Sequence, residues 1–179
     1  MPDTSPRVLI VHATKNGSTA EIAEHIGEVL TKAACAVTVR PASDTRTRVD
    51  DHDAVVIGGG LYAGRWHRNA RGFARRNARA LRGMPVWLFS SGPLDASAAE
   101  RDIPAVPGVR RIADRIDARG HITFGGRLDE NARGRMARMI VNSGKGGDFR
   151  DFAQITAWAE GIARELRSDG RTGRAGQGF

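Results

Sequence analysis

Apolar and polar positions along the chain follow two alternating patterns. Short, mostly apolar segments are typical of buried strands, and they occur at residues 8–12, 36–40, 54–57, 85–90 and 121–124. Between and after these segments, apolar residues recur every three to four positions, which predicts helices over residues 18–34, 66–81, 109–118 and 152–166. This alternation of strands and helices predicts an α/β fold with a parallel sheet.

The pattern is weaker in two regions. The sequence predicts an irregular stretch over residues 96–107, in which Pro104 and Pro107 frame a loop. Residues 127–150 form an extra segment, and its middle, residues 134–141, is predicted to be a partly apolar helix.

Length and composition fit one domain of ordinary size. The chain has 179 residues, of which 40% are hydrophobic and 27% charged. We expect a single domain over residues 1–166, and the Gly-, Arg- and Ser-rich residues 167–179 predict a disordered tail. The chain has no apolar run of about 18 residues and no signal-peptide pattern, so we expect a cytoplasmic protein. The single cysteine, Cys35, excludes an internal disulfide and a multi-cysteine metal site.

The charge changes this picture in one region. The net charge is +8, and no acidic residue stands between Asp53 and Asp95. The same interval contains seven arginines: Arg65, Arg68, Arg71, Arg75, Arg76, Arg79 and Arg82. One interpretation is a biased composition and a solvated helix face. The other is attraction of an anionic partner, such as an acidic membrane surface or an anionic substrate. Exposed aromatic residues do not alternate with these arginines, so nucleic acid is not an expected partner.

The segment between the first strand and the first helix carries the most specific chemistry. It contains the candidate binding residues Thr14, Lys15, Asn16, Gly17, Ser18 and Thr19. We expect Ser18 or Thr19 to cap the helix, although an ordinary capped helix start would explain the same residues. Hydroxyl groups, free backbone N–H groups and the positive end of a helix dipole favour an anion, typically a phosphate monoester. The loop lacks the glycine and lysine pattern of a P-loop and the three-glycine pattern of a dinucleotide site.

This loop resembles the FMN-phosphate loop of flavodoxins, T/S-x-T/D/N-G-x-T. The resemblance implies a flavodoxin-like, doubly wound α/β fold with helices on both faces of a five-stranded parallel sheet, in the order 2-1-3-4-5. It also implies FMN as the cofactor. In such a sheet, ligands bind where the carboxyl ends of the strands meet, so we expect the loops at residues 13–19, 58–67 and 90–95 to converge.

The second and third of these loops are then expected to hold the flavin ring, which needs a flat slot with an apolar or aromatic wall. The predicted ring-binding residues are Gly59, Gly60, Leu61, Tyr62, Ala63, Gly64, Ser90, Ser91, Gly92 and Leu94. Tyr62 and Trp66 are wall candidates, although either could equally be a core or a surface residue. His67, beside the same loop, could move protons or simply cap the following helix.

Within the flavodoxin-domain proteins, the chain resembles the branch of menaquinone-dependent protoporphyrinogen oxidases. The resemblance rests on residues 13–23, 53–67, 84–85 and 147–152. It implies that one FMN takes two electrons from a reduced tetrapyrrole and passes them to a quinone, on the inner membrane face. We expect the basic helix at 66–81, together with residues 127–150, to meet an anionic membrane or substrate.

Three hypotheses about function remain open at this stage. The first is an FMN enzyme that dehydrogenates a substrate or reduces a quinone. The second is a flavodoxin-type electron carrier without a substrate of its own, although such carriers tend to be acidic. The third is a flavin-free interaction domain. The five histidines lack the spacing of metal ligands, so no metal site is predicted.

Overall fold

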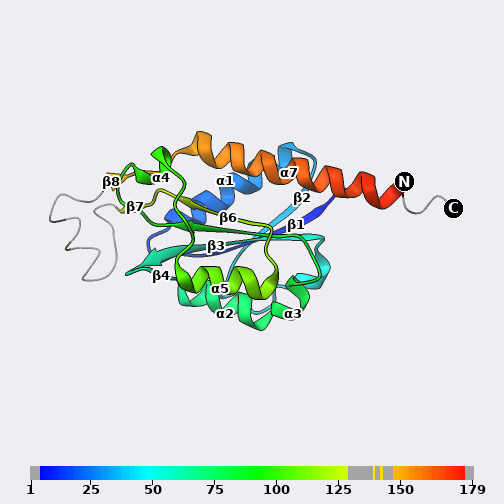
Figure 1. Cartoon of the computed structure of the whole chain (residues 1–179), viewed down its shortest axis with the longest axis horizontal. Helices are drawn as coiled ribbons and strands as arrows, with labels where there is room; N and C mark the ends of the chain where they lie inside the picture. Colours follow the sequence, from blue (N-terminus) through cyan, green and yellow to red (C-terminus); the bar gives the residue numbers. More distant parts are fainter. Residues whose placement is uncertain (1–4, 129–138, 140–141, 143–146, 176–179) are drawn as a thin grey trace.

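The computed structural model describes residues 5–128, 139, 142 and 147–175 of the chain. Five strands form its parallel sheet: β1 (Arg7–Ala13), β2 (Ala36–Pro41), β3 (Ala54–Tyr62), β5 (Val86–Ser91) and β6 (Gly120–Phe124). They lie in the order β2-β1-β3-β5-β6 (Figure 1). This is the predicted order 2-1-3-4-5 when the short strand β4 is left out of the numbering, so the flavodoxin-like fold is confirmed.

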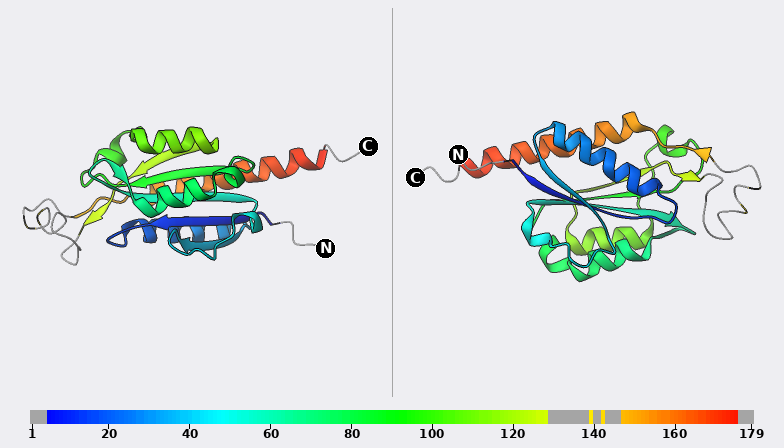
Figure 2. Two further views of the ribbon diagram at one scale, coloured as in Figure 1. Left: turned by 90° about the horizontal axis from the view of Figure 1, so that it is seen from below. Right: turned by 180° about the vertical axis from the view of Figure 1, so that it is seen from behind.

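Helices cover both faces of the sheet (Figures 1 and 2). One face packs against α1 (Ser18–Lys32) and α7 (Phe152–Ala175). The other packs against α2 (Arg68–Arg76), α3 (Ala78–Leu81) and α5 (Pro107–Ile116).

Side chains of β1 alternate between these two layers. Ile10 packs in the layer of α1, whereas Leu9 and Val11 pack in the layer of α2 and α5, and all three are fully buried. Each such side chain contributes about 1.5–3 kcal/mol to folding. The central strand thereby holds the loop that follows it at a fixed place on the carboxyl edge of the sheet.

Strand β3 is longer than predicted. It continues through the glycines to Tyr62 and then turns into β4 (Arg65–Trp66), with Leu61 opposite Trp66. The glycines are part of the sheet because neighbouring rings need the space: a Cβ atom on Gly58 would lie 2.0 Å from the Phe89 ring. The turn of this hairpin consists of Ala63 and Gly64, which both have positive φ, at 48° and 70°.

The helix predicted over residues 66–81 is wrong at its start and in its middle. Trp66 belongs to β4, and α2 begins at Arg68 with His67 as its N-cap. The helix is interrupted at Asn77, whose side-chain amide donates to the carbonyl of Phe73 at 3.0 Å. Asparagine side chains compete in this way with the helical backbone.

Helix boundaries differ from the predictions elsewhere too. Pro107 opens α5 instead of framing a loop, because the first helical position needs no N–H. The short helix α4 (Ser97–Glu100) lies in the segment predicted to be irregular, and a second short helix, η1 (Val49–Asp51), lies between β2 and β3. The prediction of a disordered tail is wrong for residues 167–175, which continue α7.

The extra segment, residues 127–150, leaves the domain and returns to it at the same place. Its two ends form the antiparallel pair β7 (Arg127–Leu128) and β8 (Gly147–Asp148). The Phe149 N–H donates to the carbonyl of Gly126 at 2.9 Å. The helix predicted over residues 134–141 falls, apart from residue 139, outside the described residues. Over the part of the chain that the structure covers, no helix has the length and apolar character needed to cross a bilayer.

Candidate cofactor-binding site

The loop between β1 and α1 is held by its own residues. Gly17, with φ of 85°, is the N-cap of α1, and its N–H donates to Oγ1 of Thr14 at 3.0 Å. The predicted capping by Ser18 or Thr19 is wrong, since both are helical residues and both are buried. Among the described residues no side chain caps α1. The N–H groups of its first turn therefore face the loop without a side-chain acceptor, which is the arrangement that binds anions.

Tyr62 lies along the edge of this loop. Its hydroxyl accepts the backbone N–H of Lys15 at 2.9 Å, and Nζ of Lys15 lies 4.8 Å from the centre of its ring. A Cβ atom on Gly60 would come within 2.9 Å of the tyrosine ring, so the ring lies directly over that glycine. The structure thus brings Lys15, Gly60 and Tyr62 together. The loops at residues 13–19 and 58–67 meet, as the sequence predicted.

Trp66 is a core residue. It is 2% exposed and packs in the layer of α2, where a Cβ atom on Gly59 would lie 2.4 Å from its Nε1. Of the two aromatic wall candidates, only Tyr62 is partly exposed at the carboxyl edge of the sheet.

Of the four predicted binding residues in the third loop, two are buried and two are partly exposed. Ser90 and Ser91 end β5 and are buried. The hydroxyl of Ser90 shares a hydrogen bond of 2.9 Å with Nε2 of His121, and burial lowers the pKa of His121 to about 4. Gly92 and Leu94 are partly exposed beyond the strand.

Leu61 links the second loop to the third. A Cβ atom on Gly92 would lie 2.7 Å from the Cβ of Leu61, so these two residues are in close contact. Ala63 and Gly64 are exposed at the tip of the β3–β4 hairpin. The hairpin therefore stands beside the start of the third loop.

His67 has the capping role that the sequence left open. Its Nδ1 accepts the N–H of Asn69 at 3.2 Å, so the neutral ring carries its proton on Nε2. Burial, with smaller effects from Lys15, Arg68 and Arg71, lowers the pKa of His67. Its ring lies 6.0 Å from that of Tyr62, in an edge-to-face arrangement.

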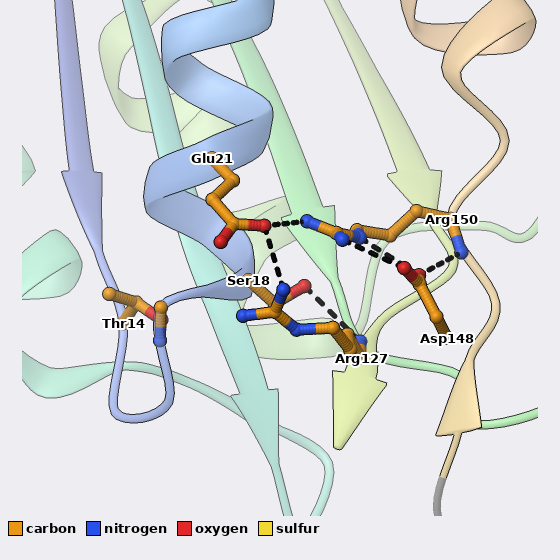
Figure 3. Close-up of polar contacts among 7 residues, drawn as sticks. Thr14, Ser18, Glu21, Arg127, Asp148 and Arg150 are labelled. Atoms are coloured by element: carbon orange, nitrogen blue, oxygen red, sulfur yellow. Dashed lines mark hydrogen bonds and ion pairs between the residues drawn. The ribbon is translucent and has the colours of Figure 1, made fainter. Parts of the chain in front are cut away.

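Sequence reasoning missed four charged residues beside the first loop. Glu21, Arg127, Asp148 and Arg150 form a chain of ion pairs between α1 and the β7–β8 pair (Figure 3). Arg127 also donates its backbone N–H to Oγ of Ser18 at 3.2 Å. The sequence signal for these contacts was weak: it consisted of one extra segment that follows a strand and two glycines.

The residues of this edge fit a flavin phosphate. The start of α1 offers uncapped N–H groups, and two cations, Lys15 and Arg127, lie beside the loop. Tyr62 lies against Gly60 and Leu61 against Gly92, so an aromatic and an apolar side chain are present at this edge, as the wall of a flavin slot requires.

Comparison with known sequences decides the family. The sequence profile of the Flavodoxin domain matches residues 9–146. The chain belongs to the flavodoxin domain family. Membership in this family, together with the flavodoxin fold, indicates that the chain binds FMN. No curated protein sequence matches this flavodoxin domain.

Solved structures agree with this flavodoxin fold. A flavodoxin from the domain Archaea has a TM-score of 0.61 at 13% identity, over 90% of this chain and 99% of that chain. Oxidised Flavodoxin 2 from Bacillus cereus has a TM-score of 0.61 at 16% identity, over 89% of this chain and 99% of that chain.

A larger protein contains a similar domain. Rubredoxin oxygen:oxidoreductase from the anaerobe Desulfovibrio gigas has a TM-score of 0.62 at 14% identity, over 92% of this chain. The match spans 37% of that protein, so the likeness concerns one part of it. At these identities, the solved structures show the shared fold.

Proposed function

We propose that this flavodoxin domain is an FMN-dependent oxidoreductase that takes two electrons from a reduced, anionic organic substrate of the porphyrinogen type. It passes them to a quinone such as menaquinone, at an anionic membrane surface. The observation that carries the proposal is a basic surface that begins at the cofactor site.

The phosphate end of FMN binds the first loop in this proposal. The loop residues Thr14, Lys15, Asn16, Gly17, Ser18 and Thr19 surround the start of α1. Backbone N–H groups of the first helical turn donate to the phosphate oxygens, and Lys15 adds a positive charge. The Thr14 hydroxyl keeps Gly17 in its left-handed conformation by accepting its N–H.

The flavin ring takes the space beside the β3–β4 hairpin and the third loop. Gly59, Gly60, Leu61, Tyr62, Ala63 and Gly64 come from β3 and its turn, and Gly92 and Leu94 come from the third loop. Ser90 and Ser91 support the edge from within the sheet. When bound, FMN supplies reversible transfer of one or two electrons with protons. The protein orients the ring, and the Tyr62 ring shields it from water.

The basic surface consists of the exposed arginines of β4, α2 and α3 and the residue that follows α3: Arg65, Arg68, Arg75, Arg76, Arg79 and Arg82. Arg65 lies opposite Tyr62 in the hairpin, so this surface starts at the redox site. No acidic residue occurs between Asp53 and Asp95 to offset it. An arginine near an anionic membrane contributes about 1 kcal/mol of attraction, so several together hold a protein there. The same field attracts carboxylate-bearing substrates.

A second candidate function is electron transfer without a substrate of its own. The similar solved structures include several flavodoxins, which favours this function. The strongly positive charge of the chain favours the enzyme, because a basic surface suits an anionic membrane or substrate.

The deciding experiment is spectroscopic. The purified protein is titrated with FMN and then photoreduced without oxygen while its absorbance is followed. Direct passage from the oxidised to the fully reduced spectrum, followed by fast reoxidation with a menaquinone analogue, supports the enzyme. A third spectral species that persists over a wide potential range supports the carrier. A protein that binds no FMN contradicts both.

A further inference from the structure

The four charged residues beside the first loop come from three segments that are far apart in the sequence. Glu21 belongs to the first turn of α1, Arg127 opens β7, and Asp148 ends β8 shortly before Arg150. Figure 3 shows both guanidinium groups directed at the Glu21 carboxylate, close to Ser18 and the turn of the loop. Such a cluster needs an explanation, because the proposed phosphate site is its neighbour.

Arg150 is the buried anchor of the cluster. Its side chain is 6% exposed, donates to Glu21 Oε2, and binds both oxygens of Asp148 at 2.8 and 2.9 Å. Its guanidinium also lies 5.0 Å from the Phe152 ring. A buried arginine keeps its carboxylate partners close, because a buried charge left without a partner destabilises the fold. Arg150 therefore fixes the Glu21 carboxylate in one place.

Arg127 is held by that carboxylate and directed at the loop. Its Nη1 donates to Glu21 Oε2 at 3.0 Å, the same oxygen that Arg150 binds. Its Nη2 lies 3.8 Å from the position that a Cβ atom on Gly17 would take. The guanidinium thus stands beside the glycine that caps α1, where the phosphate is proposed to bind.

The charges of the described residues around the loop favour an anion. Among those residues, the two arginines and the two carboxylates of the cluster cancel formally, and Lys15 and the positive end of the α1 dipole remain. A guanidinium has five N–H donors in a planar fork that matches phosphate oxygens. A phosphate beside Gly17 would be nearer to Arg127 than to the buried Arg150.

We infer that Arg127 is a phosphate-binding residue of this site, donating from its guanidinium to the FMN phosphate, with Glu21 and Arg150 as positioning residues. The inference rests on the proposed binding of FMN at the first loop. It makes the first residue of β7 part of the cofactor site. It also makes the arginine's contribution specific to the phosphate, since the flavin ring binds elsewhere.

The test compares FMN with riboflavin, which lacks the phosphate. Both are titrated into the wild type, Arg127→Gln, Arg127→Lys and the control Arg115→Gln, which changes an exposed arginine in the last turn of α5. In Arg127→Gln we expect FMN binding to weaken about tenfold or more, the effect of one charge-assisted hydrogen bond, and riboflavin binding to stay within about twofold. Arg127→Lys keeps part of the preference for FMN, and Arg115→Gln keeps all of it.

Two results for Arg127→Gln overturn the inference: equal weakening of FMN and riboflavin binding, or unchanged FMN binding. Neither result contradicts the proposal that the wild type binds FMN. A wild type that binds no FMN overturns the proposed function as well. If Arg127→Gln does not fold, Arg127→Lys decides. Lysine keeps the charge but lacks the planar fork of donors, so we expect the preference for FMN over riboflavin to fall below that of the wild type. A preference equal to that of the wild type contradicts the inference.

Discussion

At the scale of single residues, Thr14 and Thr19 hold the proposed phosphate site. Replacing both by alanine removes the acceptor for the Gly17 N–H and a second hydroxyl beside the loop. We expect FMN binding to weaken by about 2–4 kcal/mol in this double variant, because the neutral bond between Thr14 and Gly17 contributes about 0.5–1.5 kcal/mol and a hydroxyl bonded to the phosphate about 1.5–3 kcal/mol. Fluorescence titration with FMN measures the loss. Thr45→Ala, in an exposed loop, is the control, and equal affinity in both variants would contradict the site.

His121 makes the stability of the fold depend on pH. Burial lowers its pKa from 6.5 to about 4, so the folded protein holds the ring neutral beside Ser90. The contribution to stability is complete above pH 6.5 and is lost as the pH falls from 6.5 towards 4, because the unfolded chain then binds the proton more readily. We expect the free energy of unfolding to fall by about 2 kcal/mol between pH 7.5 and pH 5 through this group.

Urea unfolding at the two pH values measures this difference. His12 and His67 have lowered pKa values too and add losses of the same sign, so the comparison needs a variant. Between the two pH values, the free energy of unfolding of His121→Gln should fall by about 2 kcal/mol less than that of the wild type. The control His52→Gln should behave as the wild type. If the free energy of unfolding of His121→Gln depends on pH as it does in the wild type, His121 is not the cause of that dependence.

At the scale of elements, the β3–β4 hairpin contains a backbone conformation that suits its sequence poorly. Ala63 has φ of 48°, a left-handed conformation that costs a non-glycine residue about 1–2 kcal/mol. Ala63→Gly should therefore stabilise the protein by up to about 1 kcal/mol, and Gly64→Ala, at φ of 70°, should destabilise it by a similar amount. Thermal unfolding of both variants tests this. A destabilising Ala63→Gly would show that the methyl group contributes more than the strain costs.

The elements that the sequence predicted well are those with a local signal. β1 and the start of β3 are continuous apolar runs, and both form buried central strands. The end of β3 was missed because Gly58, Gly59 and Gly60 suggest a loop in isolation. Their place in the sheet depends on Phe89, Trp66 and Tyr62 filling the space above them.

In the candidate site too, sequence reasoning identified residues with a local pattern and missed those whose partners are distant in the chain. The first loop could be proposed as a phosphate site from its own residues, because helix starts and hydroxyl groups leave a local pattern. Arg127 was missed because its partners, Ser18 and Glu21, are more than 100 residues earlier in the chain. An ion pair between such distant residues follows from the topology of the sheet, which no periodicity in the sequence encodes.

At the scale of the whole molecule, the basic surface predicts membrane binding. We expect the protein to sediment with vesicles containing phosphatidylglycerol but not with vesicles of phosphatidylcholine alone, and to be released as the salt concentration rises. Replacing Arg68, Arg75, Arg76 and Arg79 by glutamine should remove about 1 kcal/mol of attraction per residue. The control replaces Arg110, Arg111 and Arg115, exposed residues of α5. If both sets reduce binding equally for each arginine removed, the attraction reflects net charge alone.

The antiparallel pair β7–β8 has a consequence for the design of the domain. Leu128 and Gly147 lie opposite each other, so the chain leaves the fold and returns to it across a single strand pair. A two-residue turn is sufficient to connect two paired antiparallel strands. The insert between these two residues can therefore be exchanged for such a turn, or for the insert of another family member, while Arg127 and Arg150 keep their places. The same junction lets the insert change in length and sequence without rebuilding the proposed cofactor site.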